Sequence, residues 1–198
     1  MSADHAGPQS AVAAKVRVIE ALLEQRGLLD AHAMDEALQA FLAKASPATG
    51  GRIVARAWVD PAFSARLLAD ANKAIHELGL TMAAGMQDFR LRVLENTPIT
   101  HNVIVCTLCS CYPLALLGPS PSWYKSDGYR SRVVHDPRGV LQEFGFDLAS
   151  DVRITVWDAS AETRYMVLPR RPPGTDEASE QELSELVTRN GLIGVAPV

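Results

Sequence analysis

The segment VCTLCSCYP, residues 105–113, contains all three cysteines of this 198-residue chain, Cys106, Cys109 and Cys111. An odd number of cysteines crowded into one short segment is a poor basis for a disulfide framework. The spacing C-x-x-C-x-C instead brings three thiols together on one turn of chain. We therefore begin with what such a segment can bind.

The peptide backbone of this segment can add ligands to the three sulfurs. A metal held by the Cys111 sulfur closes a five-membered chelate ring with the Cys111 amide nitrogen, and the Ser110 and Cys111 amides close another. The Cys109 sulfur closes a six-membered ring with the Ser110 amide, and Cys106 can bind from the axial side. One octahedral position then stays open for a small molecule. Because a backbone amide loses its proton only when its nitrogen binds a strong Lewis acid, trivalent cobalt or iron fits this ligand set and zinc does not.

Two simpler interpretations stay open on spacing alone. A structural zinc site would need a fourth ligand, which His101 or a more distant histidine could supply. A thiol cluster without metal could act as a redox sensor. The histidines show no metal-ligand spacing among themselves: His5, His32, His76, His101 and His135.

The bulk properties describe an ordinary globular protein. Hydrophobic residues make up 47% of the chain, and the formal net charge is −4, which argues against a general nucleic-acid binder. No apolar run is long enough to span a membrane, and the N-terminus MSADHAGPQS lacks the pattern of a signal peptide. We therefore expect a cytoplasmic protein with no nucleic-acid or membrane partner.

Several helices are predicted from capping residues and periodicity. After a leader at residues 1–9, apolar spacing predicts helices at 10–26 and, following Asp30, at 31–45. The stretch SPATGGR, residues 46–52, is predicted to be a loop. Asp60-Pro61 is a strong helix start, and that helix is expected to continue to Gly79. Ser179 and Glu182 form a capping box for a last helix that ends before Gly191.

Three strands are predicted from β-branched and aromatic residues, at 101–108, 152–159 and 163–170. The first of them runs directly into the cysteine segment. Helices precede the strands and flank them without a βαβ repeat, which favours an α+β fold over a doubly wound sheet.

Motifs in a fixed order extend on both sides of the cysteines. Downstream of VCTLCSCYP they are LLG, WYK, YRSRVV, DPRGVL, EFG, VWD, AETRYMVLP, RP, GT and LVTRNGLIGV, and upstream they are ARAWVDPAF, LLAD, ELG and LENTP. Together these motifs resemble the α subunit of nitrile hydratase over about residues 50–196. The likeness implies a leader and helical arm at residues 1–48, then a layered α–β–β–α metal-binding catalytic domain with mixed sheets at residues 49–198.

The resemblance implies an enzyme that adds water to a nitrile to give an amide. The family's metal claw corresponds to Cys106, Cys109, Ser110 and Cys111, the same set that the chelate rings indicate. By match, Cys109 would be oxidised to a sulfinic acid and Cys111 to a sulfenic acid. Thr107 and Tyr112 are similar to the cobalt class, which implies non-corrin Co(III) rather than Fe(III). The attacking oxygen would come from water or from the Cys111 sulfenate.

Partners and further site residues also follow from the resemblance. The family pairs with a β subunit as αβ or α2β2, and β supplies two arginines to the oxidised sulfurs, so this chain alone would be incomplete. A metal-delivery activator protein is a further expected partner. Gln87 matches a glutamine near the metal pocket, and Asp158, Glu162 and Arg164 match a charged network around the site. From the residues alone, those three could equally be a solvated ion cluster at a strand end.

The chain departs from the family beside the claw. Where the family commonly has Tyr-Pro-Trp-Pro, this chain has Tyr112, Pro113, Leu114 and Ala115. Leucine in place of tryptophan in a pocket wall opens space, so we expect Leu114 to allow bulkier nitriles. Two rival functions remain: the metal-bearing subunit of thiocyanate hydrolase, and a non-catalytic metal carrier or redox sensor.

Overall fold

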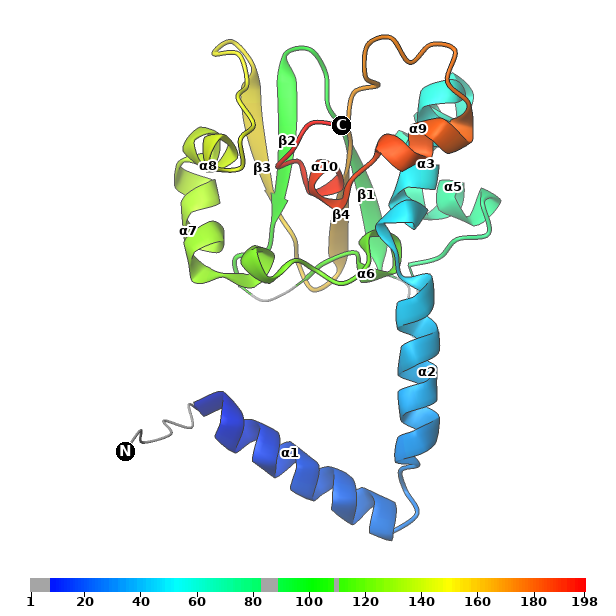
Figure 1. Ribbon diagram of the computed structural model, residues 1–198, viewed down its shortest axis with the longest axis vertical. Coiled ribbons are helices and arrows are strands. Elements are labelled where there is room, and N and C mark those ends of the chain that lie inside the picture. The colour runs from blue at the N-terminus through cyan, green and yellow to red at the C-terminus, as the bar shows by residue number, and fades with distance from the viewer. Residues whose placement is uncertain (1–7, 83–88, 109–110) are drawn as a thin grey trace. The chain divides into compact units, whose positions relative to one another are not determined.

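The computed structural model describes residues 8–82, 89–108 and 111–198, and the chain forms two compact units, Met1–Ala43 and Lys44–Val198. The second unit holds the helices and strands around the cysteines (Figure 1). In chain order its elements are α3 (Pro47–Val59), α4 (Pro61–Ala69), α5 (Ala71–Glu77), β1 (Arg90–Glu95), β2 (Thr100–Val105), α6 (Leu114–Leu117), the 3₁₀ helix η1 (Ser122–Lys125), α7 (Asp127–His135), α8 (Pro137–Glu143), β3 (Arg153–Asp158), β4 (Thr163–Leu168), α9 (Glu180–Leu186) and α10 (Arg189–Ile193).

The first unit contains the two helices predicted for the arm, α1 (Pro8–Gln25) and α2 (Ala31–Lys44). Gly27 ends the first with a positive φ of 64°, and the Asp30 carboxylate accepts from the Ala33 amide at the start of the second. Pro8 already lies in α1, so the expected leader is shorter than predicted, and its residues 1–7 lie outside the described residues.

The strands form two parallel pairs, β1 with β4 and β2 with β3. Parallel neighbours need a crossover, and the segment with α7 and α8 returns the chain from the end of β2 to the start of β3. The expected mixed sheets are therefore wrong in detail, because both described sheets are parallel. The α+β class is confirmed, with α8 against β3 and α5 against β1 on opposite flanks of the strands (Figure 1).

Strand β1 was not predicted. Its burial alternates at first, with exposed Arg90 and Arg92 on either side of buried Leu91. Two arginines in six residues weaken the pattern that would predict a strand. The segment is extended because it pairs with β4.

The loop predicted at SPATGGR is wrong, because α3 begins there. The Ser46 hydroxyl accepts from the Ala48 amide, and Pro47 occupies the first turn, where a missing N–H costs nothing. Gly50 and Gly51 are buried in this helix. A Cβ at Gly51 would lie 2.7 Å from the Ser184 carbonyl oxygen of α9, and one at Gly50 would lie 2.6 Å from Leu192 of α10. The two glycines therefore allow α9 and α10 to pack closely against α3.

Other helix ends follow their capping residues. The start at Asp60-Pro61 and the Ser179–Glu182 capping box are confirmed. The helix expected to reach Gly79 is interrupted at Asp70, which ends α4 and caps α5 by accepting from the Lys73 amide. Within the part of the chain that the structure describes, no helix has both the length and the apolar content to cross a membrane.

The α3–α9 contact yields a test of stability. Gly51→Ala should lower the free energy of unfolding by about 1–3 kcal/mol, because the clashing neighbour is backbone and cannot rotate away. Gly128→Ala in α7 is the control: its Cβ would meet nothing within 4 Å, so stability should stay the same or rise by at most about 1 kcal/mol. Urea unfolding measures both. Equal stability of Gly51→Ala and the wild type would contradict the close approach.

Candidate metal centre

The two outer cysteines are buried at the ends of one short loop. Cys106 directly follows β2 and is fully buried, and Cys111 is 9% exposed. Both belong to the main hydrophobic core. The predicted ligands Cys109 and Ser110, and the predicted pocket residue Gln87, lie outside the described residues.

The first half of the loop is held by the end of β3. Val105 pairs with Asp158 in the parallel register, and the Ala159 amide donates to the Val105 carbonyl at 2.7 Å. The Asp158 carboxylate then accepts from the Thr107 amide at 2.9 Å and from the Thr107 hydroxyl at 2.5 Å. Two residues that the resemblance placed near the metal are therefore in direct contact.

The flanks of the loop are bound by tyrosines from the crossover. The Tyr129 hydroxyl donates to the Ile104 carbonyl at 2.7 Å, and the Tyr124 hydroxyl donates to the Cys111 carbonyl at 3.3 Å. Burial raises the pKa of both phenols, so they remain protonated donors at neutral pH. The spacing of residues gave no sign of either contact, since WYK and YRSRVV entered the prediction only as motifs of the resemblance.

Tyr112 and Leu114 follow the last cysteine. The Tyr112 ring packs edge-on against Tyr124 with centroids 5.0 Å apart, and burial raises its pKa. Its hydroxyl is buried and has no hydrogen-bond partner among the described residues. Leu114 begins α6 and is half-buried against the core.

The remaining predicted residues do not form a single charged network in the described part of the chain. Arg164 is buried, donates to the Ser160 carbonyl and lies 4.4 Å from the centroid of the Phe89 ring. Glu162 is exposed. Among the described residues, no ion pair joins Asp158, Glu162 and Arg164.

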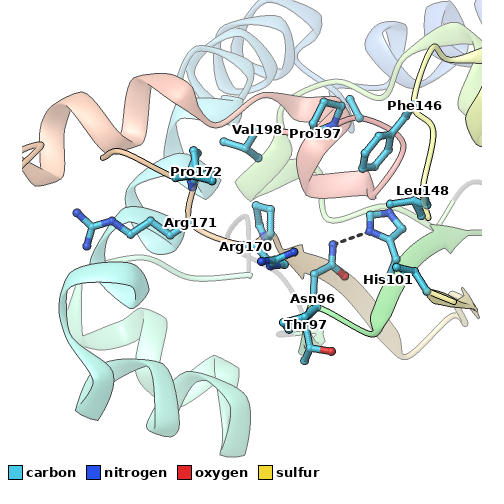
Figure 2. Close-up of a pocket in the computed structure, with 15 residues that line it drawn as sticks. Asn96, Thr97, His101, Phe146, Leu148, Arg170, Arg171, Pro172, Pro197 and Val198 are labelled. Atoms are coloured by element: carbon cyan, nitrogen blue, oxygen red, sulfur yellow. Dashed lines mark hydrogen bonds between the residues drawn. The ribbon is translucent and has the colours of Figure 1, made fainter. Parts of the chain in front are cut away.

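His101, the alternative zinc ligand, has both ring nitrogens engaged. Nε2 lies 2.7 Å from the Gly194 carbonyl oxygen, which only accepts, so Nε2 carries the proton and donates. Nδ1 accepts from Nδ2 of the Asn96 side chain at 3.0 Å, and Oδ1 of Asn96 accepts in turn from the backbone and side-chain N–H groups of Asn102. Figure 2 shows His101 and Asn96 on the wall of a cavity of about 250 Å³, with Phe146 and Leu148 beside the imidazole. This cavity lies at the start of β2, whereas Cys106 follows its end.

Comparisons with known proteins identify the family of this chain. The profile of the family described as nitrile hydratase, alpha chain, matches residues 10–196. The chain belongs to the nitrile hydratase alpha-chain family. A low-molecular weight cobalt-containing nitrile hydratase subunit alpha from Rhodococcus rhodochrous is 51% identical over 185 residues, covering 93% of this chain and 88% of that relative.

Two further relatives show how widely the fold is shared. A double mutant of the Fe-type nitrile hydratase from Comamonas testosteroni Ni1 has a TM-score of 0.87 at 40% identity, covering 96% of this chain and 92% of that one. The thiocyanate hydrolase subunit gamma of Thiobacillus thioparus is 46% identical over 158 residues, 76% of this chain and 65% of that relative. The family therefore includes proteins named for two metals and two substrates.

The buried imidazole leads to a test of pH dependence. Burial lowers the pKa of His101 below its usual 6.5, although the Gly194 hydrogen bond opposes this. The unfolded chain therefore binds the proton more readily. The contribution of neutral His101 to the free energy of unfolding should be fully present above about pH 6.5. It should be lost as the pH falls through the folded-state pKa, by up to about 1.4 kcal/mol per pH unit.

Urea unfolding at pH 7.5 and pH 5.5 measures this loss. His101→Gln should remove most of the difference between the two pH values, and the exposed His76→Gln should leave it unchanged. An identical pH dependence in His101→Gln and the wild type would show that another group is responsible.

Proposed function

We propose that this chain is the metal-bearing α subunit of a nitrile hydratase, which adds water to a C≡N bond and yields an amide. The observation that carries the proposal is the placement of Cys106 and Cys111, both buried, at the two ends of one loop that leaves β2. The names of the relatives support the same reaction class.

The proposed ligand set is Cys106, Cys109, Ser110 and Cys111, with three sulfurs and the Ser110 and Cys111 amide nitrogens. One feature of the described residues supports it: both outer thiols lie in the apolar core, which limits the access of water to them.

A trivalent ion bound there would supply a Lewis acid that makes the nitrile carbon electrophilic. The chain's own part is to hold the sulfurs, to exclude water and to orient the substrate. Cys109 as sulfinic acid and Cys111 as sulfenic acid are proposed modifications, and Cys111, Ser110 and Gln87 are the proposed catalytic residues. Asp158 would keep Thr107, and with it the start of the loop, in place through its two hydrogen bonds.

Cobalt is the proposed metal, with iron less favoured. Thr107 and Tyr112 are similar to the cobalt class, and a close relative is named as cobalt-containing. The likeness to an Fe-type structure shows that the fold alone does not select the metal.

A β subunit is the proposed partner, in an αβ or α2β2 assembly. Leu108, in the cysteine loop, is 93% exposed, and Val16, Ile19 and Leu22 on α1 are 45–56% exposed. On α1 these residues recur every three positions and so lie on one side of the helix, and an exposed apolar stripe of this kind is typical of a surface that a partner covers. We further propose that residues 1–48 form the arm and residues 49–198 the catalytic domain. The proposed location is the cytoplasm, and the proposed second partner is an activator protein that delivers the metal.

Thiocyanate hydrolase is the second candidate function, favoured by the 46% identity to its γ subunit. Both reactions hydrate a carbon–nitrogen triple bond, so the cysteine loop cannot separate them. Assays of one preparation with acrylonitrile and with thiocyanate can.

The test is co-expression of the chain with its neighbouring genes in medium that contains cobalt. We expect about one cobalt per chain, turnover of acrylonitrile to acrylamide, and a 106–111 peptide with two added oxygen atoms on Cys109 and one on Cys111. Cys106→Ser is the control and should lose the metal. Cobalt without turnover would favour the metal carrier, and an unoxidised peptide would contradict the proposed modifications.

Leu114 provides a test of specificity. Leu114→Trp should restore a bulky pocket wall and lower kcat/KM for benzonitrile about tenfold relative to acrylonitrile. Leu186→Trp, at an exposed position on α9, should leave the ratio unchanged. A wild-type enzyme that accepts only small aliphatic nitriles would refute the role of Leu114.

A further inference from the structure

We propose that Tyr124 is a positioning residue for Cys111, and that Tyr124 and Tyr129 together hold both flanks of the cysteine loop before any metal binds. The inference rests on the proposed function for its purpose, but its geometry depends on neither metal nor substrate.

Each tyrosine binds one flank of the loop through a backbone carbonyl. Tyr129 donates to Ile104, two residues before the first cysteine, and Tyr124 donates to Cys111 itself. Both rings are buried, so water does not compete for these carbonyl groups. The two hydrogen bonds are therefore made by the fold and do not need a bound ion.

The two hydroxyls are fixed relative to each other because their rings belong to one aromatic cluster. Their centroids are 5.9 Å apart, and Trp123 packs edge-on against Tyr129 at 4.8 Å and against Phe144 at 4.7 Å. At the junction of η1 and α7, the Ser126 hydroxyl donates to the Trp123 carbonyl and accepts from the Tyr129 amide. A change in the spacing of the loop flanks would have to move this whole cluster.

This spacing matters because Cys111 is proposed to bind through two atoms. Its sulfur and its amide nitrogen must both reach the ion, which restricts rotation about its N–Cα and Cα–Cβ bonds. A hydrogen bond to its carbonyl restricts the remaining backbone rotation, about Cα–C. Tyr124 thus fixes the backbone of Cys111 during folding, and this backbone does not have to be ordered when the metal binds.

Tyr124→Phe removes one oxygen atom and keeps the ring that packs against Tyr112 and Trp123. Tyr165→Phe is the matched control, because Tyr165 lies on β4 and its ring packs against Trp157 of β3, outside the cluster. Thermal unfolding of both full-length variants establishes that they fold as the wild type does.

The first readout needs no metal. The full chain, expressed without cobalt and kept reduced, is treated with iodoacetamide, and the labelling of each cysteine is followed by peptide mass. We expect Cys111 to react about fivefold faster in Tyr124→Phe, as loss of one net hydrogen bond implies, with Cys106 unchanged. Tyr165→Phe should match the wild type at both cysteines.

The second readout is the co-expressed complex at limiting cobalt. Tyr124→Phe should contain about fivefold less cobalt per chain, with a weaker sulfur-to-cobalt absorption band, while KM for acrylonitrile stays constant. Equal labelling and equal cobalt in Tyr124→Phe and Tyr165→Phe would overturn the inference.

The two proposals fail in different ways. A wild-type complex with neither cobalt nor nitrile turnover would refute the proposed function, even if Cys111 labelling still depended on Tyr124. Full activity of the wild type, with no effect of Tyr124→Phe on labelling or cobalt, would refute the positioning role alone.

Discussion

The parallel pairing of β2 with β3 is the constraint on which the cysteine loop depends. Because Val105 and Asp158 are register partners, both strands end together and the residues that follow them meet. Asp158 can then bind Thr107, and Ala159 can bind Val105. A parallel pair also requires a crossover, and that crossover carries Tyr124 and Tyr129. One topological requirement therefore supplies both supports of the loop.

Burial explains why these supports are specific. Most buried phenols have a hydrogen-bond partner, and the carbonyl groups at the loop flanks are the partners of Tyr124 and Tyr129. The Tyr112 hydroxyl is buried without one among the described residues, directly beside Cys111. The fold thus places the outer cysteines but leaves the metal open, since an Fe-type structure shares it with a TM-score of 0.87.

Capping and turn-forming residues predicted several helix ends correctly, but they gave a wrong prediction where tertiary packing determined the structure. Asp60-Pro61 and the Ser179–Glu182 capping box worked because a cap is made within one turn. The Ser-Pro and Gly-Gly pairs of SPATGGR indicated a loop, yet the first pair starts α3, and the glycines let other helices approach it. Strand β1 was missed because its partner β4 lies far along the chain.

The sequence by itself determined the family, the candidate ligands and the expectation of a trivalent metal, with cobalt favoured over iron. Those conclusions depend on covalent spacing within residues 106–111 and on the order of motifs, and neither requires knowledge of packing. Only the tertiary structure decided that Asp158 binds Thr107, that Tyr124 and Tyr129 hold the loop, and that His101 is engaged at the other end of β2. These contacts join residues 13 to 93 positions apart, and such pairs meet only when strand register and core packing bring them together.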